Sequence, residues 1–188
     1  MTTADVQPQA TGVPAGDTPD SVLAGPSTWS LDRASSAVSL HSKTMWGLST
    51  VRGAFGELTG SAEILPDGAA RGRLEIGAAS LNTKNAKRDR HLASADFFNA
   101  ADHPSIVADL ASATRTGDRV AVQGTLTVAG VTRPLSFTGT LADVTPTAFT
   151  VQAEGVVVDR ADFGITWNQL GMLTSPSTVD VVARFTRS

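Results

Sequence analysis

The chain has 188 residues, of which 41% are hydrophobic and 18% are charged, a composition typical of one globular domain. Its formal net charge of −3 argues against a large nucleic-acid-binding surface. The absence of cysteine excludes disulfides, thiolate catalysis and metal sites built on thiolates.

The first residues of the chain are rich in Thr, Ala, Pro, Gly and Asp and contain no continuous apolar run. A secretory signal needs about 7–15 consecutive apolar residues, and a membrane-spanning helix needs roughly 20. Neither pattern occurs in the sequence. We therefore expect a disordered tail over residues 1–27, one folded domain over residues 28–188 and a cytoplasmic location.

From Trp29 onward, apolar and polar residues alternate as they do in half-buried strands. Ala129-Gly130 predicts a two-residue hairpin turn between two of these strands. Eight short strands with short connections favour an all-β fold. A closed antiparallel barrel is favoured over a sandwich, because closure leaves no exposed strand edge. The alternating segments are residues 38–43, 51–65, 74–78, 106–113, 120–128, 131–141, 149–158 and 179–185.

The longest interval without strand alternation is residues 80–103, and its pattern predicts a helix. Thr83 can cap a helix that begins at Lys84. Three interpretations of the basic face of this helix stay open: a solvated surface, a site for a phosphate or another polar headgroup at the barrel mouth, and a dock for an anionic membrane. The helical period places on this face Lys84, Lys87, Arg88 and His91.

A set of motifs along the chain resembles the YceI-like family of lipid-binding proteins. The motifs are Trp29-Ser30-Leu31-Asp32, Val51-Arg52-Gly53-x-Phe55, Arg88-Asp89-x-His91-Leu92-x-Ser94-x-Asp96-Phe97-Phe98, His103-Pro104-x-Ile106, Gly124-x-Leu126-Thr127-Val128 and Arg160-Ala161-Asp162-Phe163-Gly164-Ile165. The resemblance implies an eight-stranded, lipocalin-like antiparallel barrel over an apolar cavity, with a helix in the 83–98 connection. It also implies binding of polyisoprenoid or quinone-type lipids without catalysis. Many members carry a histidine near residues 42–47, and this chain has none there, so no role of that histidine is transferred.

The candidate ligand-binding residues are the large apolar side chains that one strand parity and the helical connection would turn inward. They are Trp46, Phe55, Leu81, Leu92, Phe97, Phe98, Phe137, Phe163, Trp167 and Met172, with Arg88 and His91 placed to meet a polar head. The competing interpretation is that these residues simply fill the core. Because Ala, Gly, Val and Thr are abundant and Tyr is absent, the interior is expected to keep space for a ligand.

Other kinds of site receive less support from the sequence. We expect Asp89 to form a structural ion pair with Arg52, Arg133 or Arg160. Asp89 and His91 are two residues apart on the predicted helix, so they would not face one substrate as an acid–base pair. The histidines, which are His41, His91 and His103, have no spacing typical of a metal site.

The alternation pattern and the family resemblance together imply a non-enzymatic barrel that binds, sequesters or transports an apolar isoprenoid-like lipid. Two alternatives stay open: an enzyme acting on a lipid or small cyclic substrate inside the barrel, and a dimeric interaction module with a solid core. No cofactor is expected apart from a bound isoprenoid or another long-chain lipid. The expected partners are that lipid, a membrane surface in transient contact and a second copy of the chain, but not nucleic acid.

Overall fold

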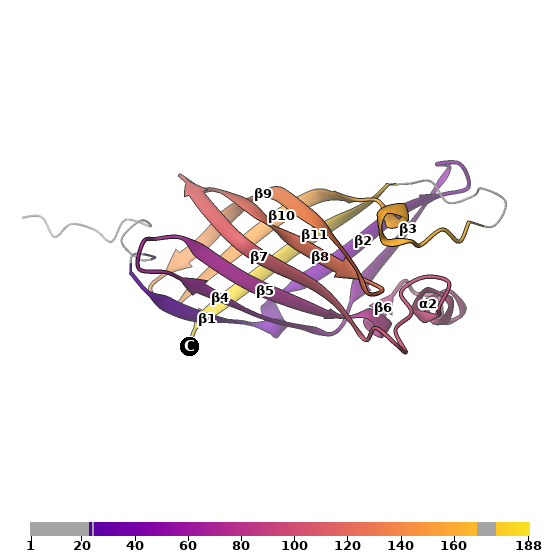
Figure 1. Ribbon diagram of the computed structural model, residues 1–188, viewed down its shortest axis with the longest axis horizontal. Coiled ribbons are helices and arrows are strands. Elements are labelled where there is room, and N and C mark those ends of the chain that lie inside the picture. Colours follow the sequence, from indigo (N-terminus) through magenta and orange to yellow (C-terminus); the bar gives the residue numbers. More distant parts are fainter. Residues whose placement is uncertain (1–22, 24, 169–175) are drawn as a thin grey trace, which may run out of the picture.

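The computed structural model describes residues 23, 25–168 and 176–188 and shows a barrel with a short helix at one end (Figure 1). The strands are β1 (Ser27–Leu31), β2 (Ala37–Thr44), β3 (Ser49–Phe55), β4 (Leu58–Ile64), β5 (Ala70–Gly77), β6 (Leu81–Asn82), β7 (Ser105–Thr116), β8 (Arg119–Val128), β9 (Val131–Thr145), β10 (Ala148–Val158) and β11 (Ser177–Arg187). The helix is α2 (Ala86–Ala93), and short 3₁₀ turns are η1 (Arg33–Ser35), η2 (Ala78–Ser80) and η3 (Arg160–Phe163).

Eight of the strands close into a ring. Its order is β1–β4–β5–β7–β8–β9–β10–β11, and β11 pairs back onto β1, with every pair antiparallel. The predicted hairpin turn at Ala129-Gly130 joins β8 to β9, and both residues have positive φ, as such a turn requires. The predicted eight-stranded antiparallel barrel is therefore confirmed.

The remaining strands extend the barrel wall at the end where α2 lies (Figure 1). The first half of β11 pairs with β2, whereas its last residues pair with β1, so β1 and β2 act as one long strand broken at η1. The wall continues through β3 to β6, which is held by the two pairs Ala54↔Asn82 and Phe55↔Leu81. Beyond β6 no strand of the described chain continues the wall, and the connection that contains α2 takes its place.

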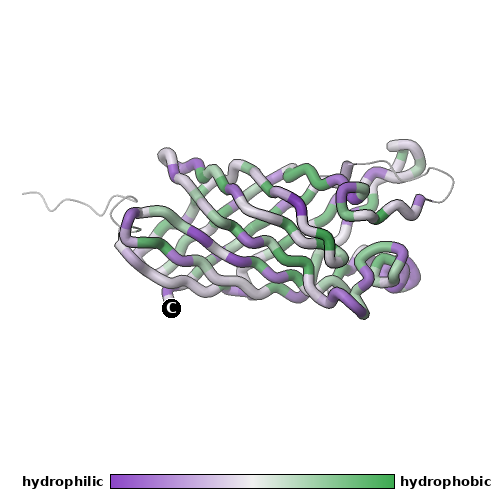
Figure 2. Tube along the Cα trace, in the orientation of Figure 1, coloured by the Kyte–Doolittle hydropathy of each residue, from purple (hydrophilic) through white to green (hydrophobic). Residues whose placement is uncertain are grey.

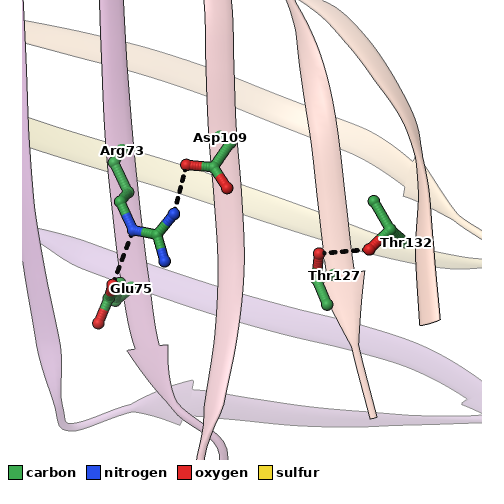
Figure 3. A network of polar contacts seen from close by, with 5 residues as sticks. All are labelled: Arg73, Glu75, Asp109, Thr127 and Thr132. Atoms are coloured by element: carbon green, nitrogen blue, oxygen red, sulfur yellow. Dashed lines mark hydrogen bonds and ion pairs between the residues drawn. The ribbon is translucent and has the colours of Figure 1, made fainter. Parts of the chain in front are cut away.

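Hydrophilic and hydrophobic residues alternate along many of the strands (Figure 2). Because successive side chains of a strand point to opposite faces, this pattern gives the barrel a polar outside and an apolar inside. On the outside, Arg73 on β5 donates to Glu75 at 2.7 Å and to Asp109 on β7 at 2.6 Å (Figure 3). Hydrogen bonds to Glu75 and then to Asp109 raise the pKa of the Arg73 guanidinium above its ordinary value. On the inside, buried residues form two hydrophobic clusters, one that includes Phe55, and one that includes Phe149.

The helix starts later than the sequence suggested. Its N-cap is Asn85, whose side chain accepts a hydrogen bond from Arg88 N at 3.1 Å, and Thr83 is instead buried. The physical reason is Lys84, which has a left-handed φ of 64° and so cannot be the first helical residue. No helix in the described ranges has the length and apolar character needed to cross a bilayer.

Candidate ligand-binding site

A cavity of about 700 Å³ runs through the barrel. Its wall takes Phe55 and Ile106 from the cluster near α2, and Phe149 and Phe185 from the cluster at the other end. The cavity therefore extends along the barrel, and its volume lies within the range of about 300–1,000 Å³ that is usual for ligand pockets.

Small side chains explain why this interior is hollow. An eight-stranded barrel is just wide enough for side chains of ordinary size to fill it. Here Ala108, Ala153 and Ala183 are buried on the cavity wall, where larger residues would close the space. No aspartate or glutamate of the described chain lies on the wall, which consists mainly of Val, Leu, Ile, Phe and Ala.

The segment around α2 is tied to the end of β6 through Thr83. Arg88 Nε donates to the Thr83 hydroxyl at 2.7 Å, and Arg88 Nη2 donates to the Thr83 carbonyl at 2.8 Å. The Asp89 carboxylate accepts hydrogen bonds from the Thr83 backbone N–H and from its hydroxyl. The expected ion pair between Asp89 and an arginine of a strand is therefore wrong, because the short turn before the helix brings Thr83 to this carboxylate first.

Aromatic rings from three segments meet at the same end of the cavity. His91 on α2 lies edge-on to Trp167, with ring centroids 4.6 Å apart, and to Phe97 at 5.2 Å. Phe98 approaches Phe55 of β3 at 6.1 Å. The His91 Nε2 atom also contacts the Asp96 carboxylate at 3.1 Å. These contacts make the connection after α2 and the residues after η3 a common cover for the cavity.

Most of the candidate residues named from the sequence lie on the cavity wall. They are Phe55, Arg88, His91, Leu92, Phe97, Phe98, Phe137, Phe163 and Trp167. Met172 falls outside the described residues. The contribution of the wall residues to ligand binding stays a prediction.

Two candidates lie elsewhere. Trp46 is 67% exposed in the turn between β2 and β3, where strand alternation stops, and it is not on the cavity wall. Leu81 is buried in the hydrophobic cluster near α2, but it is not among the residues that line the cavity. The prediction that they line the cavity is therefore corrected.

Sequence reasoning missed a further polar residue of the wall, Arg160 at the start of η3. Its Nη1 atom donates to the carbonyl of Ile165 at 3.2 Å and to that of Trp167 at 2.6 Å. The only sequence signal was its place in the motif that begins Arg160-Ala161-Asp162. That motif does not reveal that the side chain turns into the barrel.

A family profile for the YceI-like domain matches residues 29–186. The chain belongs to the YceI-like family. It is 41% identical over 61 residues to Protein YceI of Escherichia coli O157:H7 and 36% identical over 97 residues to a UPF0312 protein of Pseudomonas putida. These alignments cover 32% and 50% of this chain and the same shares of the two relatives. The matched part is thus at most half of the length of these relatives.

The fold of this YceI-like chain is also found in solved structures. Burkholderia cenocepacia BcnA gives a TM-score of 0.70 at 21% identity, over 84% of this chain and 99% of that one. A polyisoprenoid binding domain from Saccharophagus degradans gives a TM-score of 0.70 at 19% identity, over 85% and 98% of the two chains. At such identities the likeness establishes the shared fold alone.

Proposed function

We propose that this protein binds one long apolar lipid of the isoprenoid type, such as a polyprenyl or quinone lipid, inside its barrel. It would sequester or carry that lipid without changing it chemically. The observation that carries the proposal is the 700 Å³ cavity with its apolar wall. The polyisoprenoid binding domain from Saccharophagus degradans, which shares the fold, supports this class of ligand.

The cavity offers affinity through burial of the lipid tail. Each methylene that leaves water contributes about 0.8 kcal/mol, and ordering of the flexible chain offsets part of this gain. An apolar wall discriminates by length and shape but poorly between similar tails. We therefore expect affinity to rise with tail length until the cavity is filled.

The two alternatives from the sequence have less support. Acid–base catalysis inside the barrel would lack a carboxylate, because none of the described residues on the wall is Asp or Glu. No group of His, Asp or Glu in the described chain could hold a metal ion. A solid-core interaction module would have no cavity of this size.

A carrier of this kind also has to meet a membrane. A long isoprenoid is nearly insoluble in water, so it leaves and enters bilayers far more readily through a protein in contact with the surface. Transient membrane contact is therefore part of the proposal, and formation of a homodimer remains a second expectation.

Native mass spectrometry of the purified protein tests the proposal, followed by solvent extraction and mass analysis of the extract. We expect one lipid per chain, removed by the solvent and restored by adding a polyprenol or a quinone. The native mass also reports whether one or two copies are present. A protein that purifies empty and takes up neither lipid would contradict the proposal, and a chemically altered lipid would favour the enzyme.

A further inference from the structure

Arg160, on the cavity wall, has a buried hydrogen-bond donor with no acceptor among the described residues. Its Nη1 atom is engaged by the carbonyls of Ile165 and Trp167. Its Nε atom is buried and finds no acceptor anywhere in the described chain. Because an unpaired buried donor is costly and a guanidinium is always charged, this atom favours an incoming acceptor.

Two other arginines of the cavity wall are paired with carboxylates, unlike Arg160. Arg71 pairs with Glu63 at 2.7 Å, and Arg73 pairs with Glu75 and Asp109, so their charges are compensated at the outer surface. For Arg160, no carboxylate of the described residues lies within ion-pair distance. Its charge stays uncompensated beside an apolar wall.

The guanidinium of Arg88 lies on the cavity wall near α2. Arg88 donates to the hydroxyl and carbonyl oxygens of Thr83, both of which are neutral. His91, one turn further on α2, contacts the ring of Trp167, whose carbonyl accepts from Arg160. The contacts thus connect α2 with η3 at the covered end of the cavity.

We propose, resting on the function proposed above, that Arg160 binds the anionic oxygen headgroup of the lipid whose tail fills the cavity. The Nε–H group would donate to a phosphate or carboxylate oxygen, with Arg88 contributing charge nearby. Charge-assisted hydrogen bonds of this kind are stronger than neutral ones. Within the proposed isoprenoid class, this favours a lipid with an acidic head, such as a polyprenyl phosphate, over a neutral quinone.

Three probes with equal tails test this: hexadecyl phosphate, palmitate and hexadecanol, each titrated calorimetrically. The wild type should bind the two acids about tenfold or more tighter than the alcohol. Arg160→Met should remove this preference, because it should weaken binding of the two acids much more than binding of hexadecanol. Arg133→Met is the matched control, because Arg133 is exposed on β9 and lies off the cavity wall.

The outcomes separate the two proposals. If hexadecanol and the acids all fail to bind the wild type, the lipid-binding function fails. If hexadecanol binds but the acids bind no tighter, or if the preference survives in Arg160→Met, the headgroup site fails. Arg160→Met could also unfold, which thermal melting would reveal. In that case ³¹P NMR on the wild type tests the site. The second pKa of bound hexadecyl phosphate should lie below that of a short free alkyl phosphate, because a nearby guanidinium favours the doubly charged form. An unchanged pKa would overturn the site.

A separate feature is the apolar tip between β2 and β3, formed by Met45, Trp46 and Leu48. These side chains are 51%, 67% and 85% exposed. Met45 and Trp46 also hold left-handed φ values of 52° and 55°, which cost energy for bulky residues. Such exposure of large apolar residues on a strained turn marks an interaction surface.

The position and surroundings of the apolar tip fit an anionic bilayer. The tip and α2 project from the same end of the barrel (Figure 1). Ser42 and Thr44, just before the tip, line the cavity. Lys84, Lys87 and Arg90 around α2 are exposed and basic. We propose that the apolar tip enters the headgroup region of an anionic membrane, with the covered end of the cavity facing the lipid.

Vesicle sedimentation tests this second proposal. The wild type should sediment with vesicles of phosphatidylcholine and phosphatidylglycerol, and much less with phosphatidylcholine alone. Trp46→Ser and Lys87→Glu should each reduce the bound fraction several-fold. Val182→Ser, on the outer face of β11, should not reduce it. The proposal would be overturned if the wild type did not sediment with the anionic vesicles. It would also be overturned if Trp46→Ser kept its vesicle binding and instead lost a homodimer.

Discussion

Three alanines on the cavity wall keep the interior of the barrel hollow. Ala108, Ala153 and Ala183 stand where their strands turn toward the interior, and each is at least 92% buried although the cavity lies beside it. Interiors are normally close-packed, so small residues on β7 and on the paired strands β10 and β11 leave room that neighbouring side chains cannot reach. The length of the usable cavity therefore depends on a few positions.

Ala183→Phe should shorten the cavity from the end away from α2, because Ala183 belongs to the cluster that contains Phe149. If three methylenes of a long tail lose their place, the affinity falls by about 2.4 kcal/mol, or roughly fiftyfold. Short tails should keep their affinity. Titration with a series of tail lengths measures this, and Ala121→Phe on the outer face of β8 is the control. Equal losses for all lengths would show that the residue does not limit the cavity.

At the scale of elements, Thr83 holds α2 against β6. It is 5% exposed, and its hydroxyl lies between the guanidinium of Arg88 and the carboxylate of Asp89. Because the helix has only eight residues and none of them is buried, tertiary contacts of this kind have to keep it in place. Thr83 is therefore one of the contacts that keep the cover of the cavity in place, beside the aromatic contacts of His91 and Phe98.

Thr83→Val should loosen the cover. The isosteric change leaves two charged partners short of a hydrogen bond and should destabilise folding by about 1–3 kcal/mol. It should also speed the release of bound lipid. Urea unfolding and stopped-flow release of a fluorescent fatty acid measure the two effects. Thr127→Val is the control, because Thr127 bonds to Thr132 on the exposed surface (Figure 3). Unchanged release in Thr83→Val would contradict a gating role.

The elements that alternation specifies could be predicted from the sequence, and those set by local backbone geometry could not. Alternation from Trp29 onward predicts the barrel, because burial of one face fixes the register of a strand. The start of α2 was misplaced because the left-handed φ of Lys84 has no signature in a residue that is not glycine. The exposure of Trp46 depends on the strained turn between β2 and β3, and the position of Arg160 on the cavity wall depends on η3. The pattern of apolar residues encodes neither.

At the scale of the whole molecule, the hydrophobic core is split by the cavity it encloses. The cluster around Phe55 and the cluster around Phe149 both face this space, so their side chains lack contact partners when it is empty. A lipid bound as proposed would complete the core. Folding stability and lipid binding would then be linked, and the ligand-free protein should be the less stable form.

Removal of the lipid should lower the melting temperature of the wild type. At a ligand concentration of a hundred times the Kd, binding contributes about 2.7 kcal/mol, which corresponds to a rise of roughly 5–10 °C for a domain of this size. Differential scanning calorimetry before and after solvent extraction measures the change. In Ala183→Phe, the added ring occupies space that the lipid would otherwise fill. The melting temperature of the empty variant should therefore equal or exceed that of the empty wild type, and its rise with a long tail should be smaller. A wild type that melts at the same temperature with and without lipid would show that the cavity and the core are not coupled.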